Sequence, residues 1–260
     1  MFNTECVHFA GPDGDGCRCT LHGMIAKPAP FGIDLSGVTG CSGCPDAKPL
    51  EFPEFELACG MTHTPTGDRI ELFNRSRSGL RAAGLWGERI LISCDPLGRL
   101  GPFGNFYLLA TSMFLRWPNA TAYLIAQDDL QVHPEARAAV QSAWRHGQRH
   151  WAVLSLYTPP EIAERNQPVS GNEAGWYVDR AGWDSPGACC YVFSDWGLRS
   201  LLTDPVVLWH RRRGPTGGFR GTDSVVGAWA AEHGGIWHWA GPEPLVRHIG
   251  QVSTIDRGNP

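Results

Sequence analysis

The chain has 260 residues, of which 42% are hydrophobic and 18% charged, a balance typical of a globular protein with one good-sized core. Its 22 basic and 26 acidic residues give a formal net charge of −4, so the overall charge does not favour a polyanionic partner. No apolar run reaches the roughly 20 residues that cross a bilayer, and the first residues lack a secretory signal, so we expect a cytoplasmic protein without a membrane span.

Five of the nine cysteines lie within the first 44 residues, with two histidines among them. Zinc binds four soft or borderline donors in a tetrahedron, and a Cys-x-x-Cys turn lets two thiolates point at one ion. The pair at 41 and 44 has this spacing. We expect the zinc ligands to be Cys6, Cys17, Cys41 and Cys44, with Cys19, His8 and His22 as alternates.

The sequence around these cysteines is rich in Gly, Pro and Asp, and it has too little apolar patterning to bury a core. A structural metal would supply the stability that packing cannot, although an iron–sulfur cluster or free thiols are alternatives to zinc. Residues 45–53 contain three prolines without periodicity, which is typical of a linker. The pattern therefore divides the chain into a Cys-rich module with its linker, residues 1–50, and a second domain, residues 51–260.

Strands and helices alternate in the second domain, which predicts an α/β fold with a parallel or mixed sheet covered by helices on both faces. Apolar runs predict strands at 55–61, 89–94, 122–128, 153–157 and 188–193. Periodic apolar positions predict helices at 69–83, 105–116, 134–145, 195–202 and 224–232. Ligands of such sheets bind beyond the carboxyl ends of the strands. We therefore expect one crevice lined by Thr62, Thr64, Asp95 and Asp129.

The apolar strand that begins at Ala122 ends on two adjacent carboxylates, Asp128 and Asp129. Because carboxylates repel each other, the pair needs compensation by a cation, by hydrogen-bond donors or by water. One interpretation is a divalent-metal site. The other is a strand-to-helix turn that leads into a helix with Pro134 at its first position.

Two later segments give this acidic pair a context. The segment PLVRHIGQVSTI (residues 244–255) is similar to the Pro-Ser-Leu-(Val/Phe)-Gln-His-(Ile/Val)-Gly-x-x-Ser-Ser element of metal-dependent glycosyltransferases of the GT-A fold, although Glu243-Pro244-Leu245 and Arg247 depart from it. The segment GTDSVVGAW (residues 221–229) resembles the Asp-x-x-(Val/Leu)-Gly segment of the same enzymes, and Asp128-Asp129 resembles their DXD-like motif. The three occur in the expected order, and the resemblance runs from about residue 57 to residue 255.

The resemblance implies a GT-A-like, Rossmann-like fold and a hexosyltransferase that moves a sugar from a nucleotide-sugar donor, with a UDP-sugar expected, to an acceptor hydroxyl. It assigns a divalent cation, manganese or magnesium, to Asp129 and His248. Asp128 would reach the metal through water or contact the ribose, and the nucleotide would lie near the crevice residues. Asp223 is the implied general base, which gives inversion if it lies opposite the leaving group. The same residue also suits the N-cap of the helix predicted at 224–232.

The acceptor stays open between a glycan, a protein side chain and a hydroxymethylated base in DNA. Modified DNA is suggested by the Cys-rich module and by residues 199–220, where five arginines oppose one aspartate and aromatic residues are interleaved, although a solvated loop is the other interpretation. Trp176 and Trp183 are candidates to stack on a sugar. The rival function is a nucleic-acid-binding adaptor whose α/β domain is catalytically idle. A metal-dependent nucleotide hydrolase would need more carboxylates than we can place.

Overall fold

The chain forms two compact units, Met1–Pro53 and Glu54–Pro260. This computed structural model describes the backbone of residues 9–12, 17–19, 25–29 and 32–34, and that of 54–250 without 66, 68, 148–150, 160–174, 180–181, 183–186, 214–220 and 242. Side chains are described from residue 54 onward, without 145–147. Each unit is considered by itself.

The first unit contains a four-stranded antiparallel sheet in the order β1-β2-β3-β4. Its strands are β1 (Phe9–Pro12), β2 (Cys17–Cys19), β3 (Ile25–Ala29) and β4 (Gly32–Asp34). The expected zinc ligand Cys17 and the alternate Cys19 are the end residues of β2. The other expected ligands lie outside the described residues, so the zinc site stays a prediction: Cys6, His8, His22, Cys41 and Cys44.

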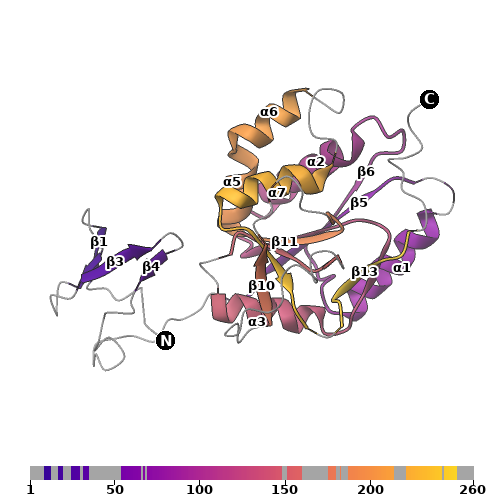
Figure 1. Ribbon diagram of the computed structural model, residues 1–260. Helices are drawn as coiled ribbons and strands as arrows, with labels where there is room; N and C mark the ends of the chain where they lie inside the picture. Colours follow the sequence, from indigo (N-terminus) through magenta and orange to yellow (C-terminus); the bar gives the residue numbers. More distant parts are fainter. Residues whose placement is uncertain are drawn as a thin grey trace. The chain divides into compact units, whose positions relative to one another are not determined.

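The second unit is built around a seven-stranded mixed sheet in the order β10-β12-β9-β11-β7-β5-β6 (Figure 1). Its strands are β5 (Leu57–His63), β6 (Ile90–Cys94), β7 (Ala122–Ala126), β9 (Val153–Ser155), β10 (Trp176–Asp179), β11 (Cys190–Ser194) and β12 (Ile236–Trp239). Strands β5, β6 and β7 are parallel, and β11 runs antiparallel to both β7 and β9. Since β12 is parallel to β9, five strands end at one edge of the sheet, which we call the carboxyl edge.

Helices cover both faces of this sheet, as Figure 1 shows. They are α1 (Arg69–Ala82) and α3 (Ala136–Gly147) on one face, and α2 (Gly101–Arg116), α5 (Asp195–Thr203), α6 (Pro205–Arg213) and α7 (Thr222–Glu232) on the other. Strand β7 shows why two layers form, because Leu124 packs into the α1/α3 core while Tyr123 and Ile125 pack into the opposite one. The structure thus confirms the predicted fold class, a mixed α/β sheet of the Rossmann-like type expected for a GT-A-like domain.

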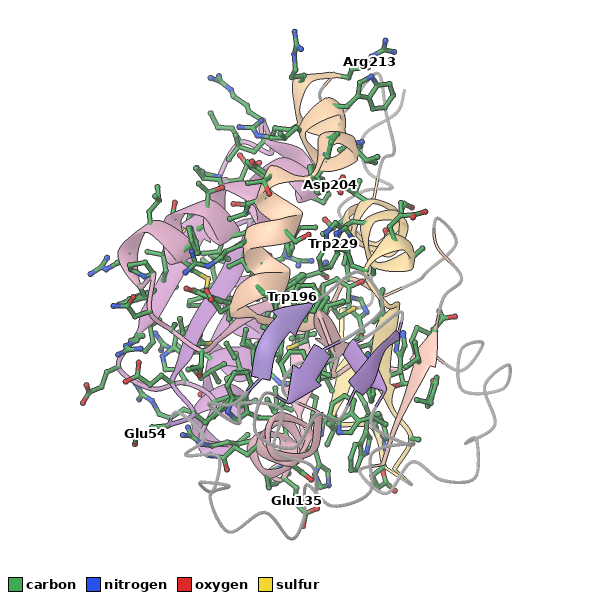
Figure 2. The ribbon with its side chains drawn as sticks, turned by 90° about the vertical axis from the view of Figure 1, so that its left-hand side faces the viewer. Glu54, Glu135, Trp196, Asp204, Arg213 and Trp229 are labelled. Atoms are coloured by element: carbon green, nitrogen blue, oxygen red, sulfur yellow. The ribbon has the colours of Figure 1, made fainter. Side chains whose placement is uncertain are left out.

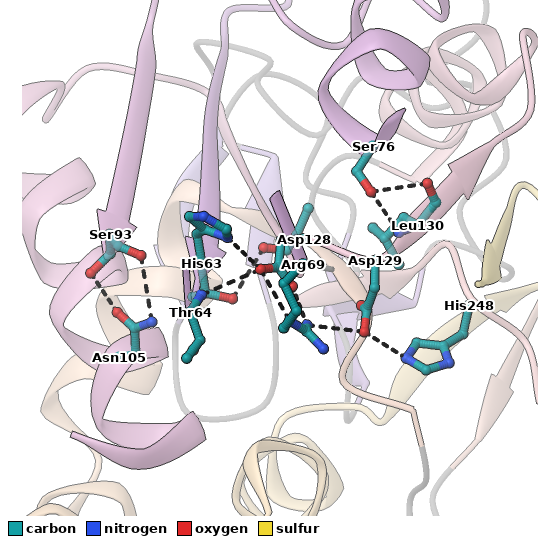
Figure 3. A network of polar contacts seen from close by, with 12 residues as sticks. His63, Thr64, Arg69, Ser76, Ser93, Asn105, Asp128, Asp129, Leu130 and His248 are labelled. Atoms are coloured by element: carbon teal, nitrogen blue, oxygen red, sulfur yellow. Dashed lines mark hydrogen bonds and ion pairs between the residues drawn. The ribbon is translucent and has the colours of Figure 1, made fainter. Parts of the chain in front are cut away.

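A small second sheet joins two distant parts of the chain. Strand β8 (Leu130–Val132) follows the acidic pair, and it pairs antiparallel with β13 (Val246–His248). In this register His248 lies opposite Leu130. The buried hydroxyl of Ser76 on α1 accepts a hydrogen bond from the amide of Leu130 and donates one to its carbonyl, so β8 is also fixed to α1 (Figure 3).

The basic segment after α5 corrects the sequence interpretation. Residues 205–213 are helix α6, not a solvated loop. A start signal was present in the sequence, because Asp204 precedes Pro205 and its Oδ1 accepts hydrogen bonds from the amides of Val206 at 2.8 Å and Val207 at 3.3 Å. An aspartate followed by proline is a favourable N-cap and first position for a helix.

Acid should weaken the second unit through His238, which lies on β12 and is fully buried. Burial lowers its pKa from the ordinary 6.5 to about 4, and Asp179 and the backbone of Tyr157 oppose this only in part. Above pH 6.5 the imidazole is neutral in both states. Between pH 6.5 and about pH 4 the unfolded chain gains a proton that the folded chain does not. We therefore expect the free energy of unfolding to decrease, by up to about 3 kcal/mol, as the pH is lowered through this range.

Urea unfolding at a series of pH values measures this effect. His238→Gln removes the titrating group, so its unfolding free energy should fall less steeply between about pH 6.5 and about pH 4, whatever the variant loses at neutral pH. An identical slope in both proteins would assign the acid sensitivity to other groups.

Candidate functional site

Polar side chains lie at the carboxyl ends of three neighbouring strands, and Figure 3 shows those that follow β5 and β7 in contact with each other. His63 ends β5, Asp95 follows β6, and Asp128 and Asp129 follow β7 after one intervening residue. Both carboxylates of the pair are almost completely buried, at 2% and 3% exposure. Their negative charge therefore has to be compensated locally.

Asp128 is compensated by donors from β5 and α1. Its Oδ2 lies 2.5 Å from His63 Nδ1 and accepts hydrogen bonds from Arg69 Nε and from the amide of Thr64, each at 3.3 Å. Its Oδ1 accepts a further hydrogen bond from the Arg69 guanidinium. Both oxygens are thus engaged within the protein, which gives Asp128 a structural role at this edge. The expected contacts to a metal-bound water or a ribose stay a prediction.

Asp129 has a different environment, because one of its oxygens is still available. Its Oδ2 lies 3.0 Å from His248 Nε2 and accepts a hydrogen bond from Arg69 at 3.1 Å. Its Oδ1 is buried without a hydrogen-bond partner in the described part of the chain. A buried carboxylate oxygen without a partner is costly, so this atom marks a position where a ligand would be stabilised.

The β8–β13 pairing brings His248 to Asp129 across 119 residues of sequence. The amide of Ile249 donates a further hydrogen bond to the Asp129 carbonyl at 2.9 Å. Gly250 packs so closely that a Cβ there would lie 2.6 Å from Asp129 Oδ2. A side chain at that position would displace the carboxylate, which explains the need for glycine beside the histidine.

The pair forms an ion pair when His248 is protonated. Burial raises the pKa of Asp129, but the hydrogen bond and charge of His248 together with Arg69 outweigh it and hold the pKa below its ordinary value. The hydrogen bond to Asp129 raises the pKa of His248 against the effect of burial. Since the His248 side chain is 34% exposed and Asp129 only 4%, the imidazole is the part of the pair that solvent reaches.

A divalent cation fits this pair as a site shared with a ligand. Two neighbouring ligands of an octahedral Mg²⁺ or Mn²⁺ with bonds of about 2.1 Å are about 3.0 Å apart, and Asp129 Oδ2 and His248 Nε2 are separated by that distance. No group of three or more Cys, His, Asp or Glu residues that could hold a metal occurs among the residues described. The described residues therefore offer two ligands, and a bound substrate and water would have to supply the others. The cation would also displace the proton from His248.

Sequence reasoning missed His63 and Arg69, which complete the network. Arg69 is the first residue of α1, and its guanidinium contacts both carboxylates. His63 also packs against Phe73, with ring centroids 4.5 Å apart. The only available signal was the position of both residues in the stretch between the first strand and the first helix, which lies at the carboxyl edge in a βαβ unit.

The other crevice residues lie at the same edge but are held by the protein itself. Thr62 donates a hydrogen bond to the Ala126 carbonyl at 3.4 Å, and the Thr64 amide donates one to Asp128 Oδ2. Asp95 accepts hydrogen bonds from the amides of Arg99 and Leu100 at 3.0 and 2.9 Å, so both of its oxygens stabilise the turn before α2. Contacts of these residues with a nucleotide stay predictions.

Asp223 lies in the first turn of α7, where Gly221 is the N-cap, so its interpretation as the N-cap residue is wrong. Its Oδ1 accepts one hydrogen bond, from the amide of Ser224 at 3.0 Å. Burial raises the pKa of Cys189 to about 12, with additional contributions from the charges of Asp129 and Asp223. Helix α7 packs on β12 and ends before that strand, which runs toward the carboxyl edge, so Asp223 at the start of α7 lies toward the same edge.

The two candidate stacking residues are not both described. Trp176 is 1% exposed and packs edge-on against Trp239, with ring centroids 5.4 Å apart, so its predicted stacking on a sugar is wrong in this structure. Trp183 lies outside the described residues. No helix in the part of the chain that is described combines the length and apolar character needed to cross a membrane.

No protein-family model and no curated protein matches the chain. Among solved structures it is similar to a mannose-1-phosphate geranyltransferase from Thermus thermophilus, with 16% identity, coverage of 71% of this chain and 73% of that one, and a TM-score of 0.41. It is also similar to a glycosyltransferase involved in glycosylation of the major capsid of PBCV-1, with 12% identity, coverage of 57% and 68%, and a TM-score of 0.29. These likenesses are too low to assign an activity to this chain.

Proposed function

We propose that the chain is a glycosyltransferase that moves a hexose from a nucleoside diphosphate sugar to an acceptor hydroxyl with the help of a divalent cation. The observation that supports it best is the Asp129–His248 pair, with its 3.0 Å separation and an unpartnered carboxylate oxygen at the carboxyl edge. The leaving diphosphate carries negative charge that a cation would stabilise. A UDP-sugar as donor and manganese or magnesium as cation belong to the same proposal.

The residues around the pair would hold it in position. Arg69 contacts both carboxylates and is 11% exposed at its side chain, so it fixes the orientation of Asp129 relative to Asp128. Asp129 and His248 would hold the cation, whose contribution when bound is to neutralise the developing diphosphate charge. Because the His248 side chain is 34% exposed while that of Asp129 is buried, solvent reaches the pair at the imidazole, where a diphosphate could complete the coordination.

Asp223 would take the proton from the acceptor hydroxyl. It is partly buried near the end of the sheet that carries Asp129, and one hydrogen bond from the backbone orients its carboxylate. Loss of the proton makes the acceptor oxygen a better nucleophile as the bond to the anomeric carbon breaks. Attack from the side opposite the diphosphate inverts the configuration.

Asp223→Asn should lower kcat by about 10²- to 10⁴-fold, because a general base contributes in this range, while donor binding stays unchanged. Asp195→Asn is the matched control, since Asp195 is also the acidic residue of a first helical turn but follows β11 at the opposite edge of the sheet. Steady-state kinetics and donor titration of both variants separate the two effects. Wild-type kcat in Asp223→Asn would remove Asp223 from the chemistry.

The donor is identified by thermal unfolding with UDP-, GDP-, ADP- and dTDP-sugars, each with and without Mn²⁺. A ligand that binds only the folded state at about 100 times its Kd stabilises it by about 2.7 kcal/mol. We expect one nucleotide class to raise the melting temperature, only with the cation present. Equal shifts without a cation, or no shift with any nucleotide, would contradict the proposal.

A further inference from the structure

Helix α6 carries an unusual exposed surface on the second unit. Three of its large apolar side chains are exposed, Val206 at 40%, Leu208 at 41% and Trp209 at 44%. Its last turn adds three exposed arginines, Arg211, Arg212 and Arg213. We call these six residues the α6 surface. Figure 2 shows the end of α6 at Arg213 projecting away from the body of the unit.

Only one side of α6 is used for packing. Val207 and His210, three residues apart on the helix, are buried at 0% and 3% exposure. His210 packs edge-on against Phe103 of α2, with ring centroids 4.6 Å apart. The apolar residues of the α6 surface therefore do not belong to the core, and each of them is about two-fifths exposed to solvent.

The arginines of this surface have no acidic partner in the described part of the chain. None of them forms an ion pair among the described residues, and the nearest carboxylate in sequence, that of Asp204, caps the start of the helix. Arg213 instead stacks on Trp209, with its guanidinium carbon 4.6 Å from the ring centroid, and Arg211 lies 5.5 Å from the Tyr107 ring. Uncompensated positive charge thus adjoins exposed apolar side chains on one short helix.

The basic end of α6 lies near the carboxyl edge. The contact between His210 and Phe103 places it beside the start of α2, and α2 follows the turn held by Asp95 at that edge. Helix α7, which carries Asp223, begins nine residues after Arg213. A partner held by the α6 surface would therefore lie beside the candidate site.

We propose that the α6 surface docks the protein onto an anionic bilayer surface. Exposed tryptophan and aliphatic side chains next to arginines are the composition of helices that lie in the membrane interface, where the apolar groups enter the acyl boundary and the cations contact lipid phosphates. Nucleic acid also attracts arginine and tryptophan, but it gives Val206 and Leu208 no apolar environment. The inference does not depend on the proposed function.

Co-sedimentation of the full chain with lipid vesicles tests this inference. Wild type should bind vesicles of phosphatidylglycerol and phosphatidylcholine, bind phosphatidylcholine alone weakly, and be released by salt. Arg212→Gln and Arg213→Gln should each weaken binding about fivefold. The double change Leu208→Ser with Trp209→Ser should weaken it at least about tenfold.

Controls on the other face of the sheet are Ile70→Ser and Arg81→Gln, an exposed apolar and an exposed basic residue of α1, which should bind like wild type. Thermal unfolding checks that every variant is folded, and Asp129→Asn should bind vesicles normally even though it loses activity. The proposal is overturned if wild type does not bind the anionic vesicles, or if the α6 variants bind as well as the controls. Binding of single-stranded DNA without vesicle binding would overturn it in favour of a nucleic-acid partner.

Discussion

Asp129→Asn is expected to remove cation-dependent donor binding and to lower kcat/KM by about a thousandfold or more, the scale of losing a charged ligand from a catalytic metal site. The substitution preserves size and removes the charge that attracts the cation. It also replaces an oxygen that lies near His248 and Arg69. Turnover at saturating donor and titration with Mn²⁺ measure the two losses.

A double-variant cycle makes the test specific to one shared ion. His248→Gln should reproduce the loss, because Asp129 Oδ2 and His248 Nε2 are 3.0 Å apart and would hold the same cation. If so, the activity of the double variant should lie within a small factor of the activity of the less active single variant. Effects that multiply would show that the two residues act separately, and wild-type turnover in Asp129→Asn would exclude the proposed role.

Asp128→Asn should act on stability, and we expect it to lower the free energy of unfolding by about 3 kcal/mol. Asp128 is 2% exposed and accepts hydrogen bonds from three groups, including the partly buried Arg69 guanidinium. The amide leaves that guanidinium with Asp129 as its only negatively charged partner in the network. A change of this size lowers the melting temperature by roughly 6 to 12 °C for a unit of about 200 residues.

An exposed ion pair provides the control for this prediction. Glu56 and Arg89 lie 2.5 Å apart, but their side chains are 40% and 34% exposed. Glu56→Gln should therefore change stability by less than about 1 kcal/mol. If urea unfolding gives Asp128→Asn the same small effect, the buried network does not stabilise the fold. If the folded variant instead loses donor affinity, Asp128 contacts the nucleotide as the sequence predicted.

The sequence predicted the centre of the second unit best, because its strands are continuous buried apolar runs. Strand β7 and helix α1 were expected at the residues where they occur, within one or two positions. Strands β10 and β12 were missed since each has only four residues and carries polar groups such as Asp179 and His238. Strands β8 and β13 have three residues each and exist only through their pairing, which no local pattern reveals.

The candidate site was predictable only in part for a related reason. The DXD-like pair and the histidine segment have recognisable spacing, and the structure brings Asp129 and His248 together. The roles of His63 and Arg69 depend on which carboxylate each one contacts, and that is set by the crossing of β5, α1 and β7. The sequence likewise could not decide whether Asp223 caps α7, because Gly-Thr-Asp-Ser allows the helix to begin at more than one residue.

The pairing of β8 with β13 means that the candidate site can form only late in synthesis of the chain. Translation delivers Asp129 long before its histidine, so a nascent chain can complete β5 to β7 while the acidic pair has Arg69 and His63 as its only protein partners from this network. Until β13 pairs with β8, the carboxylates have Arg69 beside them but the imidazole of His248 is not yet in place. If the proposed site binds a cation, it would do so only after β13 has been synthesised and has paired with β8.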